Sequence, residues 1–198
     1  MANEIWLFRH GETEWSKSGA HTSRTDLSLT PDGRGHAKQL GRWLAGREFS
    51  AVFTSPLKRA RETCELAGYG DVAQIDPNLH EWDYGDYEGL STPDIRKKRP
   101  DWNLWRDGVP NGEAIGQVAA RSRTVIDGAL KVEGDVALFA HGHVLRILTA
   151  CWLDQTPDAA RLYALSTASV SSLGFERDTR VITTWNISVG KLKCDGQT

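Results

Sequence analysis

The chain has 198 residues, of which 39% are hydrophobic, and its 24 lysines and arginines nearly balance its 26 aspartates and glutamates. This length suits a single domain over residues 1–198, and the balance of charge gives no reason to expect nucleic acid or an anionic membrane as a partner. Residues 1–4 lack the basic start and apolar core of a signal peptide, and no apolar run approaches the length of a membrane span. We therefore predict a cytoplasmic protein whose cysteines, Cys64, Cys151 and Cys194, are free thiols.

Strand-like and helical patterns alternate along the chain. Apolar runs predict strands at 4–8, 51–54, 73–75 and 135–140. Apolar residues at helical spacing predict helices that run from the Thr30–Pro31 cap to Gly46, from a Ser55–Pro56 cap onward, over 113–130, and after His143. Two alternating segments, 169–175 and 180–185, predict a closing β-hairpin, and 190–198 has the pattern of a loose tail. This alternation is typical of an α/β domain.

Two of the predicted strands end in a histidine. The strand at 5–8 leads directly into Arg9 and His10, and the strand at 136–140 leads into His141. Parallel strands of one sheet have their carboxyl ends at the same edge, where α/β proteins place their binding crevice. We therefore expect the two imidazoles to face each other across one crevice.

A third strand end adds an arginine to this edge. The strand at 51–54 leads into a predicted helix, and Arg59 falls on its first turns. Guanidinium groups, helix N-termini and protonated imidazole all favour phosphate oxygens. A neutral imidazole between arginines can also attack phosphorus, and the phosphorylated ring divides one difficult displacement into two easier ones. These residues predict a pocket for a doubly negative group with a histidine nucleophile.

A leaving alkoxide needs a proton donor, and the segment 80–89 offers several carboxyl groups. Glu81 is the best candidate, because the flanking aromatic rings would raise its pKa by desolvation. Asp83, Asp86 and Glu88 are the competing candidates.

Together these motifs, in this order and over nearly the whole chain, resemble the histidine phosphatase family, which is also called phosphoglycerate mutase-like. The residues that carry the resemblance are 9–13, 55–63, Glu81, Gly85, 88–89 and 141–142. The resemblance implies a three-layer α/β/α sandwich with a mostly parallel central sheet.

The resemblance also implies a role for each matching residue. His10 becomes phosphorylated, and Glu81 acts first as an acid and then as a base. The groups that bind phosphoryl oxygens are Arg9, Arg59 and His141. Substrate binding is predicted for Ser16, Thr22, Ser23 and Gly142, and for Tyr84 as one of the aromatic residues that could line the substrate mouth.

Within the family, three stretches are similar to a subgroup that contains bacterial acid phosphatases and the yeast sedoheptulose-1,7-bisphosphatase: 15–19, 81–89 and 102–108. The cofactor-dependent mutases have asparagine where Ser16 stands, a substrate-binding lysine where Thr92 stands, and longer insertions. Many relatives also have glycine where Ser23 stands, beside Thr22. The resemblance thus favours hydrolysis over transfer. We expect a metal-independent phosphatase that uses no cofactor and hydrolyses phosphate monoesters of small metabolites, sugar phosphates or bisphosphates, through a phosphohistidine.

Three other functions stay open. One is a cofactor-dependent phosphoglycerate mutase. Another is a metal hydrolase, because the spacing of His141 and His143 suits metal ligands, although Arg146 places a cation where a metal site needs carboxylate. The third is a non-catalytic module that binds phosphorylated ligands, which would gain nothing from a proton donor such as Glu81 opposite His10.

The stretch 80–112 has the least regular periodicity and is predicted to form an excursion above the sheet edge. Its aromatic residues either line the substrate mouth or pack the excursion against the domain: Trp82, Tyr84, Tyr87, Trp102 and Trp105. For Trp102 and Trp105, packing is the favoured interpretation. Three basic residues of the same stretch are candidates to hold a second phosphate: Lys97, Lys98 and Arg106. For the two lysines, the favoured interpretation is a solvated helix face. The remaining histidines are interpreted as surface or loop residues: His21, His36 and His80.

Overall fold

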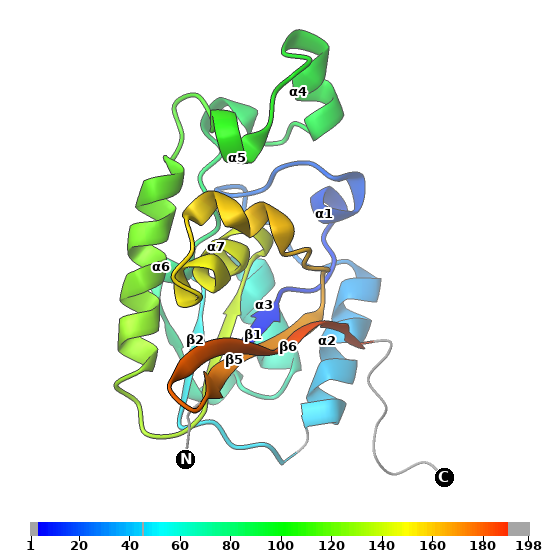
Figure 1. Cartoon of the computed structure of the whole chain (residues 1–198). Helices are drawn as coiled ribbons and strands as arrows, with labels where there is room; N and C mark the ends of the chain where they lie inside the picture. The colour runs from blue at the N-terminus through cyan, green and yellow to red at the C-terminus, as the bar shows by residue number, and fades with distance from the viewer. Residues whose placement is uncertain (1–3, 45, 190–198) are drawn as a thin grey trace.

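The computed structural model describes residues 4–44 and 46–189, in which six strands form one sheet in the order β3-β2-β4-β1-β5-β6 (Figure 1). The strands are β1 (Ile5–Arg9), β2 (Ala51–Thr54), β3 (Ala73–Ile75), β4 (Val136–Ala140), β5 (Ser169–Glu176) and β6 (Thr179–Ser188). Strands β3, β2, β4 and β1 are mutually parallel, whereas β5 and β6 are added in antiparallel pairs. The predicted parallel sheet and closing hairpin are confirmed. The tail predicted at 190–198 lies outside the described residues.

Three neighbouring strands, β2, β4 and β1, end level with one another. The His10 N–H donates to the Ala140 carbonyl at 3.0 Å, and the Ser55 N–H donates to the Phe139 carbonyl at 2.9 Å. These bonds continue the parallel register one residue past the strand ends. The residues that follow the strands, His10, Ser55 and His141, therefore meet at one edge of the sheet.

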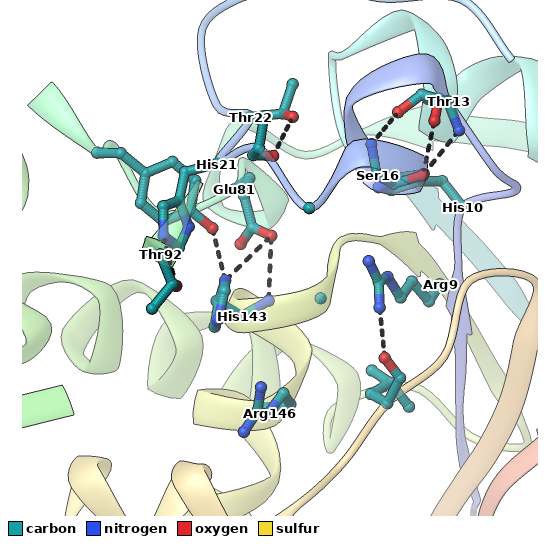
Figure 2. Close-up of a pocket in the computed structure, with 15 residues that line it drawn as sticks. Arg9, His10, Thr13, Ser16, His21, Thr22, Glu81, Thr92, His143 and Arg146 are labelled. Carbon is teal, nitrogen blue, oxygen red and sulfur yellow. Dashed lines mark hydrogen bonds and ion pairs between the residues drawn. The ribbon is translucent and has the colours of Figure 1, made fainter. Parts of the chain in front are cut away.

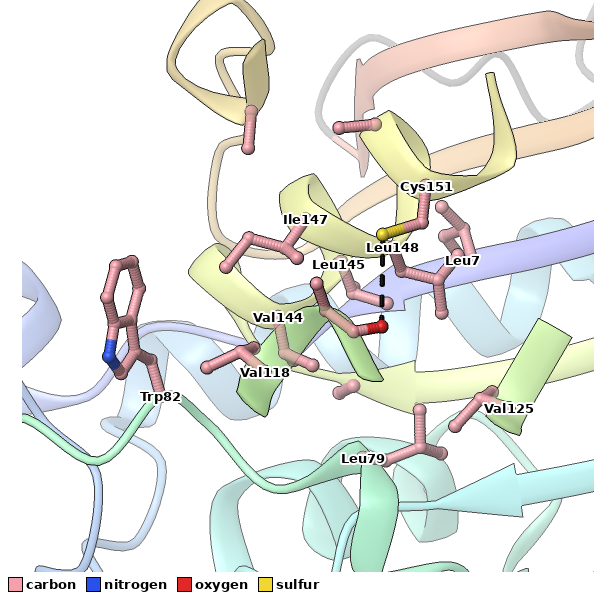
Figure 3. Packing of buried hydrophobic residues seen from close by; sticks show 14 of the residues in the cluster. Leu7, Leu79, Trp82, Val118, Val125, Val144, Leu145, Ile147, Leu148 and Cys151 are labelled. Carbon is pink, nitrogen blue, oxygen red and sulfur yellow. Dashed lines mark hydrogen bonds between the residues drawn. The ribbon is translucent and has the colours of Figure 1, made fainter. Parts of the chain in front are cut away.

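Helices cover both faces of this sheet. Helices α2 (Pro31–Leu44) and α3 (Lys58–Leu66) pack on one face, and α6 (Ile115–Ala129) and α7 (Gly142–Trp152) pack on the other (Figure 1). Strand β4 is buried at every residue, as expected for a parallel strand that is covered on both sides. Figure 3 shows Leu145 and Leu148 of α7 in the same apolar cluster as Leu7 of β1. The predicted three-layer sandwich is confirmed.

The N-terminus of α3 differs from its prediction. The helix begins at Lys58, with Leu57 in the N-cap position, and not at the predicted Ser55–Pro56 cap. The Ser55 hydroxyl accepts the Leu57 N–H at 3.3 Å, and it also contacts His141. Ser55 is thus held by the strand edge, and the helix starts only after the chain has turned away from the sheet.

Shorter elements connect the strands and the longer helices. The helices are α1 (Glu14–Ser18), α4 (Thr92–Lys98) and α5 (Leu104–Asp107), and the 3-10 turns are η1 (Gly70–Val72), η2 (Pro77–Leu79), η3 (Gly85–Tyr87) and η4 (Pro157–Leu162). Figure 1 shows α4 and α5 at the top of the molecule, in the predicted excursion. Trp102 is buried and Trp105 packs against the core cluster, as the packing interpretation expects.

Among the described residues, no helix is long and apolar enough to span a membrane.

Candidate active site

A pocket of about 250 Å³ opens where β1 and β4 end (Figure 2). Of the predicted catalytic residues, Arg9, His10 and Glu81 line this pocket. Of the predicted substrate-binding residues, Ser16, Thr22, Tyr84 and Gly142 line it. Three other predicted residues, Arg59, His141 and Ser23, do not reach the lining and are completely buried next to it.

His10 is held as a neutral imidazole with one defined free nitrogen. Its Nδ1 lies 2.7 Å from the Gly11 carbonyl oxygen, which can only accept, so Nδ1 carries the proton and donates. The lone pair is therefore on Nε2. Burial, followed by the charges of Arg59 and Arg9, lowers the pKa of His10 well below its usual range. A neutral ring with a free Nε2 can act as a nucleophile.

Two arginines act on His10 through their charges: Arg9, the last residue of β1, and Arg59, in the first turn of α3. Arg59 is completely buried, and its terminal nitrogens donate to the carbonyls of Thr22 and Thr25 at 3.0 and 3.2 Å. Arg9 donates through Nη1 to the Leu165 carbonyl. These bonds fix both guanidinium groups and leave the Nε atom of each without a partner.

The site gathers buried nitrogen atoms that lack hydrogen-bond partners. Within the described residues, five buried side-chain polar atoms have none, and three of these are Arg9 Nε, Arg59 Nε and His141 Nδ1. The His141 ring centroid lies 5.1 Å from that of His10. Buried polar groups are nearly always paired in folded proteins, so these three nitrogens are exceptions and are available to bind an anion.

Glu81 lies at the N-terminus of α7, across the pocket from Arg9 and His10 (Figure 2). Its Oε1 accepts the N–H groups of Trp82 and Val144, both at 2.9 Å, and its Oε2 accepts the His143 N–H at 3.0 Å. Two of these donors belong to the first turn of α7, whose N–H groups have no partner within the helix. The carboxyl group is therefore fixed in position, and Oε2 keeps more free capacity than Oε1.

The structure separates Glu81 from the three competing carboxylates, none of which lines the pocket. Asp83 pairs with Arg24, and Asp86 accepts from the Asn111 amide at 2.9 Å. Glu88 accepts the backbone N–H groups of Ser23 and Thr25, in the loop at 22–25. Arg59 donates to a backbone carbonyl of the same loop. These three carboxylates stabilise loops around the site.

Beyond Glu81, the pocket is lined by residues that the sequence did not assign to it: His21, Thr92, His143 and Arg146. The Tyr84 hydroxyl lies 2.6 Å from His143 Nδ1. Burial lowers the pKa of His143 well below its usual range and raises that of Tyr84 well above its own, so both groups are uncharged. Helical spacing, which puts His143 and Arg146 on one face of α7, is the signal that could have found these two residues.

The basic residues of the excursion are placed elsewhere. Lys97 pairs with Asp94 at 2.6 Å, and Arg106 pairs with Asp107 at 2.8 Å. Neither they nor Lys98 line the pocket. Besides Arg9, the pocket is lined by the cation Arg146, whose guanidinium carbon lies 4.6 Å from the ring centroid of Trp105. Metal-binding groups of three or more His, Cys, Asp or Glu side chains are absent from the described part of the chain.

The sequence of residues 5–188 matches the family model of the Histidine phosphatase superfamily (branch 1). The chain belongs to this superfamily. It is 39% identical over 182 residues to an acid phosphatase from Mycobacterium tuberculosis, a match that covers 90% of this chain and 89% of that protein. It is 40% identical over 179 residues to sedoheptulose 1,7-bisphosphatase from Saccharomyces cerevisiae, covering 74% of this chain and 66% of that one. The predicted family is confirmed.

Other members of the superfamily are similar to the chain in sequence or in structure. A 2,3-bisphosphoglycerate-dependent phosphoglycerate mutase from Mesorhizobium japonicum is 35% identical over 165 residues, which covers 75% of this chain and 80% of the mutase. The solved structure of a Mycobacterium tuberculosis open reading frame superimposes with a TM-score of 0.90 at 37% identity, covering 94% of this chain and 98% of that one. The histidine phosphatase family thus includes both phosphatase and mutase relatives of this chain.

Proposed function

We propose that this protein is a metal-independent phosphatase that hydrolyses phosphate monoesters of small metabolites, sugar phosphates or bisphosphates, through a phosphohistidine on His10. The observation that carries the proposal is the set of three unpaired buried nitrogens, on Arg9, Arg59 and His141, beside a neutral His10. A phosphoryl group bound there would satisfy these nitrogens with its oxygens and present phosphorus to His10 Nε2.

In the first step, Nε2 of His10 attacks phosphorus while the bond from phosphorus to the leaving alcohol oxygen breaks. Arg9, Arg59 and His141 bind the phosphoryl oxygens, and the Gly142 backbone lies close to Arg9, where a Cβ atom at position 142 would be 3.3 Å from Arg9 Nε. Glu81, with a proton on Oε2, donates it to the departing oxygen. The products of this step are the alcohol and a phosphorylated His10.

In the second step, a water molecule attacks phosphorus from the side that the alcohol has left. Glu81, now a carboxylate, removes a proton from this water, and the bond between phosphorus and His10 Nε2 breaks. Inorganic phosphate is released, and both residues return to their initial protonation states. Each proton that Glu81 gives is thus returned within one turnover.

The outer part of the pocket suits the remainder of a sugar phosphate. His21, Thr92 and His143 offer polar atoms to hydroxyl groups, and Arg146 offers a positive charge to a second phosphate. The relative that is named a sedoheptulose 1,7-bisphosphatase supports a substrate of this class. Ser16, Thr22 and Tyr84, which line the same pocket, complete the proposed substrate-binding set.

The alternative supported by a specific relative is a phosphoglycerate mutase. Thr92 lines the pocket at the position where those mutases have a lysine, so this pocket lacks that cation. A binding module without catalysis is a weaker alternative, because the Glu81 carboxyl group is held rigidly at the pocket opposite His10. The cytoplasmic location and the lack of a nucleic-acid partner stay predictions, and the oligomeric state stays open.

The test is a panel of sugar phosphates, bisphosphates and phosphoglycerates, assayed for phosphate release in the presence of a chelator. Wild-type protein should release phosphate, and acid quench with a labelled substrate should trap an acid-labile, alkali-stable phosphoenzyme that the His10→Ala variant lacks. The exposed His36→Ala variant is the matched control and should behave as wild type. Activity that requires added zinc would refute the proposal in favour of a metal hydrolase. Isomerisation of phosphoglycerate with little phosphate release would refute it in favour of a mutase.

A further inference from the structure

Ser55 lies directly behind His141 and does not line the pocket. Both residues are completely buried, and the Ser55 Oγ lies 2.7 Å from His141 Nε2. The same Oγ accepts the Leu57 N–H at 3.3 Å. The other ring nitrogen of His141, Nδ1, is buried and has no partner.

These contacts decide the direction of the bond between Ser55 and His141. A serine hydroxyl has one hydrogen to donate, and the Leu57 N–H already uses one of its lone pairs. Within the described residues, His141 Nε2 is the only other group shown in contact with this hydroxyl. The Ser55 hydrogen therefore has a partner only if His141 Nε2 accepts it.

The ring proton of His141 is then on the other nitrogen. Burial, followed by the charge of Arg59, lowers the pKa of His141 well below its usual range, so the ring is neutral and carries a single proton. With Nε2 accepting from Ser55, this proton is on Nδ1. The unpaired Nδ1 atom beside His10 is thus an N–H donor and not a lone pair.

We propose that Ser55 is a positioning residue that holds His141 in its Nδ1–H tautomer, so that this N–H donates to an oxygen of the transferred phosphoryl group. The opposite tautomer would direct a lone pair at the phosphoryl oxygens and repel them. The proposal rests on the proposed phosphatase function for its catalytic consequence. The tautomer itself can be measured whether or not the protein hydrolyses phosphate esters.

The direct test is nitrogen-15 NMR of the histidine rings in the complete protein at neutral pH, with the His141 signals assigned from a His141→Gln variant. Wild-type His141 should show a protonated Nδ1 and an unprotonated Nε2. The Ser55→Ala variant should shift both signals toward a mixture of tautomers. A wild-type ring with its proton on Nε2 would overturn the proposal, even if Ser55→Ala does not fold.

Kinetics provide the second test. Ser55→Ala should lower kcat/KM for a sugar phosphate at neutral pH by about 10- to 100-fold, by analogy with the loss seen when a group that orients a metal-binding histidine is removed. It should weaken the binding of inorganic phosphate as well. Ser55→Thr, which keeps the hydroxyl, should recover much of the loss. The matched control is Ser122→Ala, which removes another completely buried serine hydroxyl, on α6.

The control variant separates a tautomer effect from a packing defect. A loss of kcat/KM in Ser55→Ala that Ser122→Ala matches would overturn the proposal, because it would reflect the removal of any buried serine hydroxyl.

Discussion

At the residue scale, the structure distinguishes the four carboxyl groups that were candidates for the proposed proton transfer. Glu81 is buried at the pocket and accepts three backbone N–H groups, whereas Asp83, Asp86 and Glu88 bond elsewhere. Oε1 accepts two of the three donors and Oε2 accepts one, so in the proposed mechanism Oε2 carries the proton toward the substrate. A fixed carboxyl group is what general acid catalysis requires, because the proton must reach the leaving oxygen within hydrogen-bond distance.

The replacement Glu81→Gln keeps the shape of the side chain but removes the acidic proton. We expect it to slow phosphorylation of His10 by an alkyl phosphate by roughly 10²- to 10⁴-fold, the usual contribution of general acid catalysis. The loss should be much smaller with nitrophenyl phosphate, because nitrophenolate leaves readily without a proton. Rapid-quench measurement of phosphoenzyme formation is the appropriate readout, since the later water attack is common to both esters.

Asp86→Asn is the control for this prediction. It makes the same chemical change at an exposed carboxylate of the same segment, and it should leave both rates near those of the wild type. Equal losses for the two esters in Glu81→Gln would show that Glu81 has a structural role and does not donate the proton.

At the element scale, the start of α2 packs against the loop that follows β1. Thr30 caps α2, as predicted, by accepting the Gly33 N–H at 3.0 Å. A Cβ atom at Gly33 would lie 2.3 Å from the Glu12 carbonyl oxygen, and one at Gly11 would lie 2.6 Å from the Gly33 carbonyl oxygen. Both contacts involve backbone atoms, so neither clash can be relieved by moving a side chain. This close approach holds the loop that carries His10.

Gly33→Ala should therefore separate α2 from the His10 loop. We expect a loss of about 1–3 kcal/mol in the free energy of unfolding, as for other overpacked interior sites, together with reduced phosphatase activity. Urea unfolding and a phosphate-release assay would measure the two effects. In the same helix, a Cβ atom at Gly35 would have no atom within 4 Å, so Gly35→Ala should be neutral or stabilising by about 0.5–1 kcal/mol. Equal behaviour of the two variants would contradict the proposed role of this contact.

At the scale of the whole molecule, folding buries three neutral histidine rings near one edge of the sheet. Burial is the largest cause that lowers the pKa of His10, His141 and His143 well below the usual value. In the unfolded chain these rings take up protons as the pH falls below about 6.5, whereas in the folded protein they stay neutral. The unfolded state then binds more protons, so stability falls as the pH falls through this window.

Each such histidine should lower the free energy of unfolding by about 1.4 kcal/mol for every pH unit below about 6.5, until its folded-state pKa is reached. Urea unfolding curves at a series of pH values from 7.5 to about 5 would test this prediction. His143→Gln should reduce the slope by about one proton, whereas His36→Gln, at an exposed position of α2, should leave it unchanged. A slope that His143→Gln does not change would mean that this ring is already charged in the folded protein.

Much of this protein was determined by local sequence. The periodicities placed the strands that end at Phe8 and Ala140, because a strand buried on both faces must be continuously apolar, and the cap at Thr30 placed α2. The motifs placed His10, Glu81 and the arginines, and the relatives confirm the family that these motifs indicated. Local patterns can do this because each depends on neighbours in the chain.

Only the tertiary structure decided which of these residues meet. It moved the start of α3 to Lys58, because the Ser55 hydroxyl is engaged by His141, far away in the sequence. It also brought His21 into the pocket, and of the four candidate carboxyl groups it placed Glu81 in the pocket lining, against the N–H groups of α7. Such choices depend on contacts between segments distant in sequence, and neither periodicity nor spacing specifies those contacts.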